Sequence, residues 1–156
     1  MKVGGKRKLE VPARLAYGAS APPGSSIPPN SDLYFDVELL DLVKPGEENM
    51  YDKTDLKQGT GPAVANGDTV TVHYVGTLVN GRRFDSTVER KKPETFTLGK
   101  GNVIKGLEAG LIGMKPGGKR RLRIPPGIGY GSYGMGQVPP GSITIFEVEL
   151  LKVKKG

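Results

Sequence analysis

Residues 69–87 read TVTVHYVGTLVNGRRFDST, and this stretch decides the fold. From Val70 to Tyr74, apolar and polar side chains alternate, which is typical of a strand with one buried face. The pair Asn80-Gly81 then predicts a tight hairpin turn, because both residue types tolerate the backbone conformation that such turns require. An extended segment over residues 82–86 follows, so the stretch predicts two antiparallel strands joined by a hairpin.

The segment that follows predicts one short helix. Residues 102–112 read NVIKGLEAGLI, and Asn102 stands in position to cap the N-terminus of a helix. Four apolar side chains fall on one face at helical spacing: Val103, Ile104, Leu107 and Leu111. The sequence MKPGG at residues 114–118 ends the helix.

Further strands are predicted over residues 94–98, 119–124 and 142–153. In the last of these, the side chains from Phe146 to Leu150 alternate between an apolar and a more polar face. Several antiparallel strands with one amphipathic helix make an α+β fold, in which the helix covers one face of the sheet.

The composition of the 156 residues narrows the chemistry. There is no cysteine, which excludes disulfides and thiolate chemistry, and no apolar run approaches the roughly 18–20 residues of a membrane span. His73 is the single histidine and is predicted to face solvent, so we expect neither a metal site, nor a Ser/His/Asp triad, nor another cofactor. The opening residues MKVGGKRK lack the apolar core of a signal peptide, so we expect a cytoplasmic protein unless a targeting segment lies upstream.

The net charge of +7 is unevenly distributed along the chain. Residues 49–156 carry seventeen Lys and Arg against nine Asp and Glu, whereas residues 1–48 carry six against seven. A basic unit can attract acidic partners, including nucleic acid. The basic run at residues 119–123 is interpreted as an exposed strand face, and a nucleic-acid partner is the least favoured hypothesis.

An internal repeat divides the chain. Residues 1–18, MKVGGKRKLEVPARLAYG, match residues 114–131, MKPGGKRRLRIPPGIGYG, without a gap. Residues 27–40 match residues 138–151 in the same order. The first copy therefore corresponds only to the last part of the second.

The repeat predicts three segments. We expect a C-terminal fragment of one unit over residues 1–43, a linker over residues 44–49 and a complete unit over residues 50–156. The fragment is interpreted either as the end of a truncated preceding unit or as a partial duplication whose strands pair with the other copy.

Five blocks of the complete copy occur in the order and spacing of a known family. They are VHYVGTLVNGRRFDST (72–87), TFTLGKGNVIKGLEAGLIGM (95–114), GGKRRLRIPP (117–126), YGSYGMGQVPPGSI (130–143) and FEVELLKV (146–153). The chain thereby resembles the FKBP-type peptidyl-prolyl cis-trans isomerases. The resemblance implies a five-stranded antiparallel sheet wrapped round one short helix, with a ligand pocket between them and a partial copy of the fold at the N-terminus.

The resemblance also implies which residues form a pocket for proline. Carried over position by position, the catalytic residues are Asp85, Tyr74, Tyr130 and Phe84, and the substrate-binding residues are Phe96, Val103, Ile104, Leu107, Val138, Phe146 and Arg90. Two positions depart from the common family pattern. Leu107 stands where the pocket floor is often Trp, and Glu94 stands where an aromatic residue is common.

Roles for the polar groups follow from the same resemblance. The Tyr130 hydroxyl and the backbone N–H of Ile104 would donate hydrogen bonds to substrate carbonyls. Asp85 would lie beside the twisting carbonyl, where Tyr74 orients it and Arg90 pairs with it.

The reaction of this family requires no nucleophile, metal or proton donor. Rotation about an X-Pro bond meets a barrier of roughly 18–20 kcal/mol because amide resonance is lost, and an apolar cavity disfavours the charge-separated planar amide. We therefore expect an isomerase that acts on proline-containing peptides or proteins and binds immunosuppressant macrolides such as rapamycin. The alternative is a non-catalytic peptide-binding or chaperone module that uses the same cleft, which Leu107 and Glu94 favour.

The first copy holds one wall of a second pocket and nothing more. Its Tyr17, Ile27 and Phe35 match Tyr130, Val138 and Phe146. We expect residues 1–43 to form at most a two-stranded unit without isomerase activity. Its exposed edges and apolar face make pairing with another chain a further hypothesis.

Overall fold

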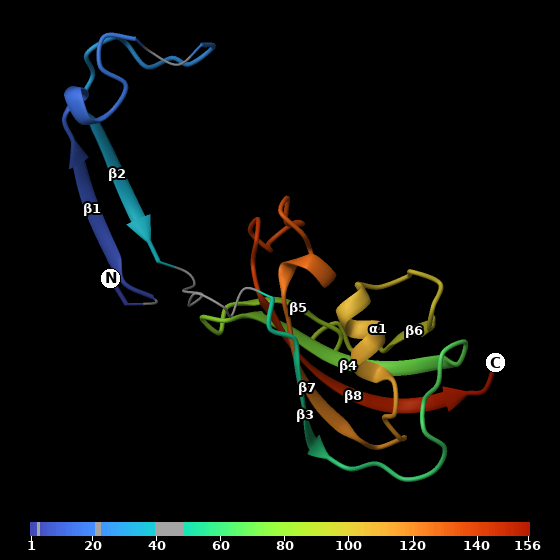
Figure 1. Cartoon of the computed structure of the whole chain (residues 1–156). Coiled ribbons are helices and arrows are strands. Elements are labelled where there is room, and N and C mark those ends of the chain that lie inside the picture. Colours follow the sequence, from blue (N-terminus) through green and yellow to red (C-terminus); the bar gives the residue numbers. More distant parts are fainter. Residues whose placement is uncertain (3, 21–22, 40–48) are drawn as a thin grey trace. The chain divides into compact units, whose positions relative to one another are not determined.

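The computed structural model describes residues 1–2, 4–20, 23–39 and 49–156 (Figure 1). The chain divides into two compact units, Met1–Leu42 and Val43–Gly156. Apart from Asn49, the linker predicted over residues 44–49 lies outside the described residues.

The larger unit is built on one antiparallel sheet. Its strands are β3 (Asp52–Lys57), β4 (Thr69–Leu78), β5 (Arg83–Ser86), β6 (Glu94–Thr97), β7 (Lys119–Ile124) and β8 (Thr144–Lys154). They lie in the order β3-β7-β8-β4-β5, and β6 also pairs with β4. Because β8 pairs with β4 along its whole length, β5 and β6 share the other edge of β4. The sheet is therefore five strands wide, as the resemblance implies.

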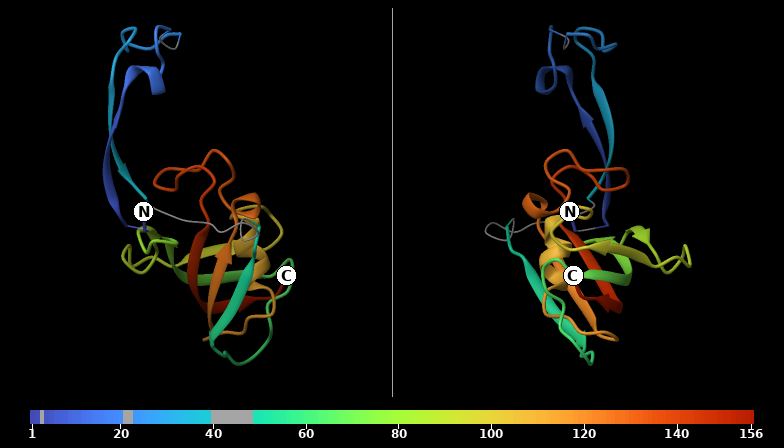
Figure 2. Two further views of the ribbon diagram at one scale, coloured as in Figure 1. Left: turned by 60° about the vertical axis from the view of Figure 1, so that its left-hand side comes forward. Right: turned by 90° about the vertical axis from the view of Figure 1, so that its right-hand side faces the viewer.

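Helix α1 (Lys105–Leu111) packs on one face of this sheet, as Figures 1 and 2 show. Two glycines permit the close approach. A Cβ atom on Gly106 would overlap the side chain of Ile124, and a Cβ on Gly110 would overlap Leu122. Glycine disfavours helix formation, so tertiary packing rather than intrinsic propensity stabilises this seven-residue helix.

The core lies between α1 and the sheet. Strand residues from one face of β4, β7 and β8 meet the helix there: Val70, Val72, Leu122, Ile124, Phe146, Val148 and Leu150 pack with Leu107 and Leu111. The alternation predicted for residues 70–74 and 146–150 is confirmed by these buried positions.

The predicted start of the helix was wrong. The helix begins at Lys105 rather than at residue 102, and Ile104 occupies the N-cap without a side-chain hydrogen bond. Ile104 has an extended backbone, and its carbonyl accepts the first helical hydrogen bonds, from Leu107 and Glu108. Asn102 therefore lies in the preceding loop and does not cap the helix.

Strand β3 was missed because it has no apolar face. All six of its residues are exposed, so its sequence shows no period-two signal. Its place is decided by pairing with β7 and by Arg120, whose Nε lies 2.6 Å from Asp55 Oδ1.

Arg120 corrects the interpretation of residues 119–123 as an exposed basic face. Its side chain is buried, and its Nη1 donates to the carbonyls of Gly110 and Ile112, at 2.6 and 3.1 Å. One guanidinium thus joins β3, β7 and the C-terminal end of α1. Arg121, its neighbour in sequence, is exposed.

His73 is not solvent-facing as predicted. It is half-buried, and its Nδ1 lies 3.0 Å from the hydroxyl of Thr87, which is itself buried. The turn after β5 places Thr87 against this face of β4, where the Thr87 hydroxyl also accepts a hydrogen bond from the N–H of Tyr74.

The smaller unit is a two-stranded hairpin, β1 (Lys6–Val11) and β2 (Leu33–Glu38), with a 3-10 turn at Ala13–Leu15. It reproduces the β7–β8 pair of the larger unit. The pairing of Lys6 with Glu38 corresponds through the sequence repeat to that of Lys119 with Glu149. Both pairs of side chains form ion pairs, at 3.7 and 3.1 Å.

Within the described residues, neither α1 nor any other helix is long and apolar enough to cross a membrane.

We predict that Arg120→Leu destabilises the larger unit, because the carbonyls at the end of α1 lose their donor and Asp55 loses its partner. The loss should be about 1–3 kcal/mol, since Asp55 remains partly solvated. Urea unfolding of the full chain, followed by circular dichroism, measures the change. The control Arg121→Leu should stay within about 0.5 kcal/mol of the wild type. Equal effects of the two substitutions would contradict this role for Arg120.

Candidate active site

An aromatic cluster lies at one end of the core, where β4, β5 and β8 meet the loop after β7. Phe84 contacts Tyr130 and Phe146 edge-on, with ring centroids 5.6 Å apart in each pair. Tyr74 packs on Phe146 at the same centroid distance, in a tilted arrangement. Edge-to-face contacts of this kind favour a well-defined ring geometry. The cluster therefore forms a rigid apolar wall.

Beside this wall lies an open cavity of about 410 Å³. Seven of its lining residues were expected from the sequence or noted there as departures: Tyr74, Glu94, Val103, Ile104, Leu107, Tyr130 and Phe146. Gly101, Asn102 and Met135 also line it and were not expected. No sequence signal marked Met135, because it lies on a loop whose path only the folded chain defines.

Five of the expected pocket residues do not line this cavity: Phe84, Asp85, Arg90, Phe96 and Val138. Phe84 belongs to the aromatic wall, and Asp85 and Arg90 interact with Tyr74 or with each other beside it. Phe96 and Val138 are buried and do not line this cavity. Phe96 belongs to the core cluster, and Val138 forms an isolated bridge with Met135. A linear pattern of apolar residues does not distinguish such buried positions from positions that line a cavity.

Among the described residues, Asp85 is the only one whose carboxylate accepts a hydrogen bond from Tyr74. The Tyr74 hydroxyl donates to Asp85 Oδ2 at 2.6 Å, and the Arg90 guanidinium pairs with the other carboxylate oxygen. Arg90 also reaches Glu94 on the rim of the cavity, at 3.7 Å. These four side chains form one polar network along the edge of the aromatic wall.

The network controls protonation at the site. Partial burial raises the pKa of Asp85, but hydrogen bonds from Tyr74 and Arg90 outweigh burial and bring the pKa below its usual value. Burial and the hydrogen bond to Asp85 raise the pKa of Tyr74 to about 12. At neutral pH, Asp85 is therefore an anion and Tyr74 a neutral donor.

Two further donors face no partner within the described residues. The hydroxyl of Tyr130 makes no hydrogen bond there, and burial together with the charge of Asp85 raises its pKa, so it stays protonated. The backbone N–H of Ile104, at the entrance to α1, likewise donates to no described residue. Both groups line the cavity and can donate to the carbonyls of a bound ligand.

The floor of the cavity is apolar. Leu107 is buried and is held there by α1, while the side chain of Glu94 is half exposed at the rim. Among the described residues, no group of three or more His, Asp or Glu side chains could hold a metal ion. The arrangement suits a small apolar ring whose flanking carbonyls accept hydrogen bonds.

Comparison with known proteins agrees with this geometry. The family model for FKBP-type peptidyl-prolyl cis-trans isomerases matches residues 1–40 and 61–151, so it covers parts of both units. An FK506-binding protein of Neisseria meningitidis serogroup B is 55% identical over 100 residues, which are 64% of this chain and 92% of that protein. The peptidyl-prolyl cis-trans isomerase FKBP9 of Homo sapiens is 36% identical over 151 residues, 97% of this chain. This chain spans only 26% of the length of FKBP9.

Solved structures show the same fold. FkpA from Escherichia coli superposes with a TM-score of 0.63 and 42% identity, over 67% of this chain and 48% of that one. AtFKBP13 gives a TM-score of 0.63 and 40% identity, over 67% of this chain and 93% of that one. The sheet, the helix and the cavity all agree with these matches. The chain belongs to the family of FKBP-type peptidyl-prolyl cis-trans isomerases.

Proposed function

We propose that the larger unit accelerates rotation about X-Pro bonds in protein substrates by binding the prolyl ring in the cavity above Leu107. The observation that carries this proposal is the anion of Asp85, held by Tyr74 and Arg90 beside an apolar cavity. A planar amide carries more separated charge than a twisted one. A site that removes water and places a fixed negative charge near the carbonyl oxygen therefore disfavours the planar form.

The remaining groups position the substrate. The Tyr130 hydroxyl and the Ile104 N–H would bind the carbonyls that flank the proline, while the rings of Tyr74 and Phe146 exclude water. Holding the flanking residues while the X-Pro bond turns lowers the roughly 18–20 kcal/mol barrier without covalent chemistry.

We also propose that the cavity binds macrolides such as rapamycin. The meningococcal relative is named for binding FK506, and the cavity here offers an apolar floor with two convergent donors. Leu107 presents less surface than the Trp that is common in the family, so we expect weaker macrolide binding than in members that have the Trp.

A second candidate is a peptide-binding module without catalysis. The half-exposed carboxylate of Glu94, which shares Arg90 with Asp85, favours it, because competition for Arg90 weakens the hold on Asp85. This candidate predicts peptide binding by the wild type with no acceleration of exchange.

We predict that Asp85→Ala lowers kcat/KM about ten- to a hundredfold, because the fixed charge beside the twisting carbonyl is lost. A protease-coupled assay on a short X-Pro peptide measures the rate, and NMR exchange provides a check that needs no protease. The control Asp52→Asn changes an exposed carboxylate on β3 and should leave the rate unchanged. If the wild type itself gave no acceleration, the peptide-binding candidate would replace the isomerase.

We expect Tyr130→Phe to lower kcat/KM about fivefold to twentyfold through loss of one hydrogen bond to substrate. The ring can keep its edge-on contact with Phe84, so folding should be unaffected. The matched control is Tyr133→Phe, three residues along the same loop and 92% exposed. Similar losses in the two variants would show that the Tyr130 hydroxyl does not bind substrate.

We predict that kcat/KM is constant between about pH 5 and pH 9, measured by NMR exchange. The folded-state pKa of Asp85 lies below its unfolded value of about 3.9, and that of Tyr74 is about 12, so neither group titrates in this window. The stability that the depressed Asp85 pKa contributes is present above about pH 4 and is lost as pH falls through the folded pKa. A rate that changed with a midpoint near neutral pH would rule out this protonation state.

A further inference from the structure

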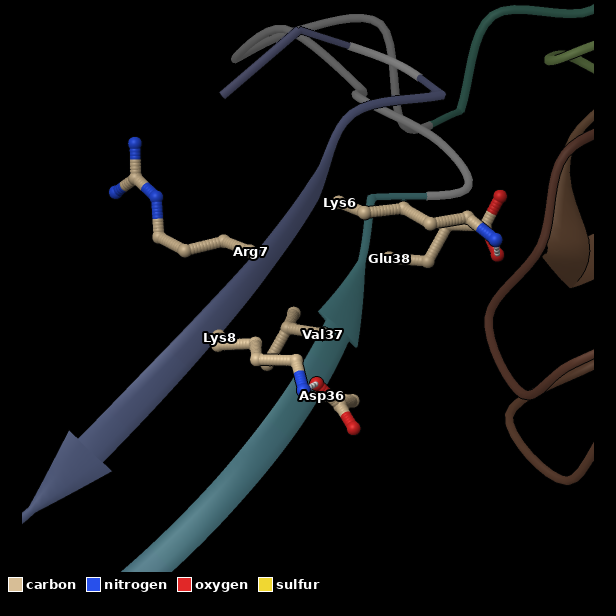
Figure 3. A pocket seen from close by; sticks show the side chains of 6 residues that line it. All are labelled: Lys6, Arg7, Lys8, Asp36, Val37 and Glu38. Carbon is tan, nitrogen blue, oxygen red and sulfur yellow. Dashed lines mark ion pairs between the residues drawn. The ribbon is translucent and has the colours of Figure 1, made fainter.

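The hairpin of the smaller unit has two unlike faces. One face carries Arg7, Leu9 and Val11 of β1 opposite Val37, Phe35 and Leu33 of β2, in that cross-strand order. We call these six residues the hairpin face. The other face is polar, with ion pairs from Lys6 to Glu38 and from Lys8 to Asp36, as Figure 3 shows. Such a division is typical of a sheet that buries one side.

The hairpin face repeats a set of side chains that the larger unit buries. Its six residues correspond through the sequence repeat to Arg120, Leu122, Ile124, Thr144, Phe146 and Val148, all of them buried. Phe35 is 45% exposed, whereas its counterpart Phe146 is 2% exposed. The same apolar pattern and the same pairing register thus occur twice. In the larger unit, other parts of the fold bury these side chains, whereas no described residue does so in the hairpin.

The larger unit shows which elements bury this set of side chains. Strand β4 pairs with the outer edge of β8, and α1 rests on Leu122 and Ile124 through two glycines four residues apart. Asp55 and the carbonyls at the end of α1 surround Arg120. All three features come from residues 50–113.

The hairpin offers a matching contact surface for the strand, the helix and the carboxylate. Strand β2 pairs only with β1 among the described strands, so its other edge is open to a strand like β4. Leu9 and Val11 correspond to Leu122 and Ile124, against which α1 packs through its two glycines. The side chain of Arg7 makes no hydrogen bond or ion pair with any described residue, and it corresponds to Arg120, which binds a carboxylate and two carbonyls.

Arg7 also decides between possible occupants. The hairpin face carries no acidic side chain, so stacking two copies face to face would enclose two guanidinium groups without a carboxylate. Burial of an unpaired charge is strongly unfavourable. A segment that supplies a carboxylate at the position of Asp55 avoids this cost, which favours it over a second copy of the hairpin.

We propose that the hairpin face is a docking surface for a polypeptide segment from outside residues 1–156 that has the chemistry of residues 50–113. That chemistry is an alternating apolar strand, a short helix with glycines four residues apart, and an acidic outer strand. Segment and hairpin together form a second FKBP-like unit. The match to FKBP9 spans 151 residues of this chain, so it includes most of the hairpin as well as the larger unit.

The test uses the full chain and, as probe, a fluorescently labelled peptide of residues 50–113, with binding measured by anisotropy. We expect saturable binding that Phe35→Asp weakens about tenfold or more, the change expected when a large side chain can no longer be buried. Lys8→Ser, on the polar face of the same hairpin, should stay within about twofold, since exposed ion pairs contribute little. Unchanged isomerase activity of both variants establishes that the larger unit is folded.

Two matched changes test the predicted contacts. Arg7→Glu in the chain should weaken binding of the probe, and a probe carrying Asp55→Arg should restore it. A probe carrying Gly110→Val should bind poorly, because its side chain would overlap Leu9 as it would overlap Leu122 in the larger unit.

Three outcomes would overturn the proposal. One is no binding of the unmodified probe at about 100 μM, which corresponds to less than about 5.5 kcal/mol of binding free energy. Another is binding that Phe35→Asp leaves unchanged, which would mean that the probe exchanges into the larger unit. The third is a dimer of the full chain, seen by sedimentation without probe and abolished by Phe35→Asp, which would make a second copy the occupant.

Discussion

Helix α1 rests directly on β7 because Gly106 and Gly110 place no side chain between the helix backbone and the sheet. The close contact brings Leu107 to the floor of the cavity and places Ile104, the residue that precedes α1, in its lining. A bulkier residue at either glycine would lift the helix and widen the site. The geometry of the cavity therefore depends on the absence of two side chains as well as on the aromatic wall.

The same contact explains why the two copies of the hairpin differ in exposure. In the larger unit, α1 covers Leu122 and its end accepts hydrogen bonds from Arg120, so an apolar and a charged side chain are buried together. In the smaller unit, Leu9 and Arg7 hold the same places on the strand. The hairpin keeps its register without a cover because the ladder and its cross-strand pairs are local.

Function in this fold arises where an apolar wall meets a fixed charge. Tyr74 belongs to both, since its ring packs on Phe146 while its hydroxyl binds Asp85. The carboxylate therefore stays ionised beside an apolar cavity, and the partly exposed Arg90 balances its charge. Such an arrangement needs no bound cofactor to act on an amide, because the reaction breaks no covalent bond.

The sequence by itself determined the strands with one apolar face, the turn at Asn80-Gly81, the repeat and the family, because local alternation and conspicuous blocks carry that information. It also indicated most of the residues around the cavity. Only the tertiary structure decided that the helix begins at Lys105, that β3 joins the sheet, and that Arg120 is buried. It also showed that Phe96 and Val138 are buried without lining the cavity. These features depend on contacts between residues far apart in the chain, which no local pattern of polarity records.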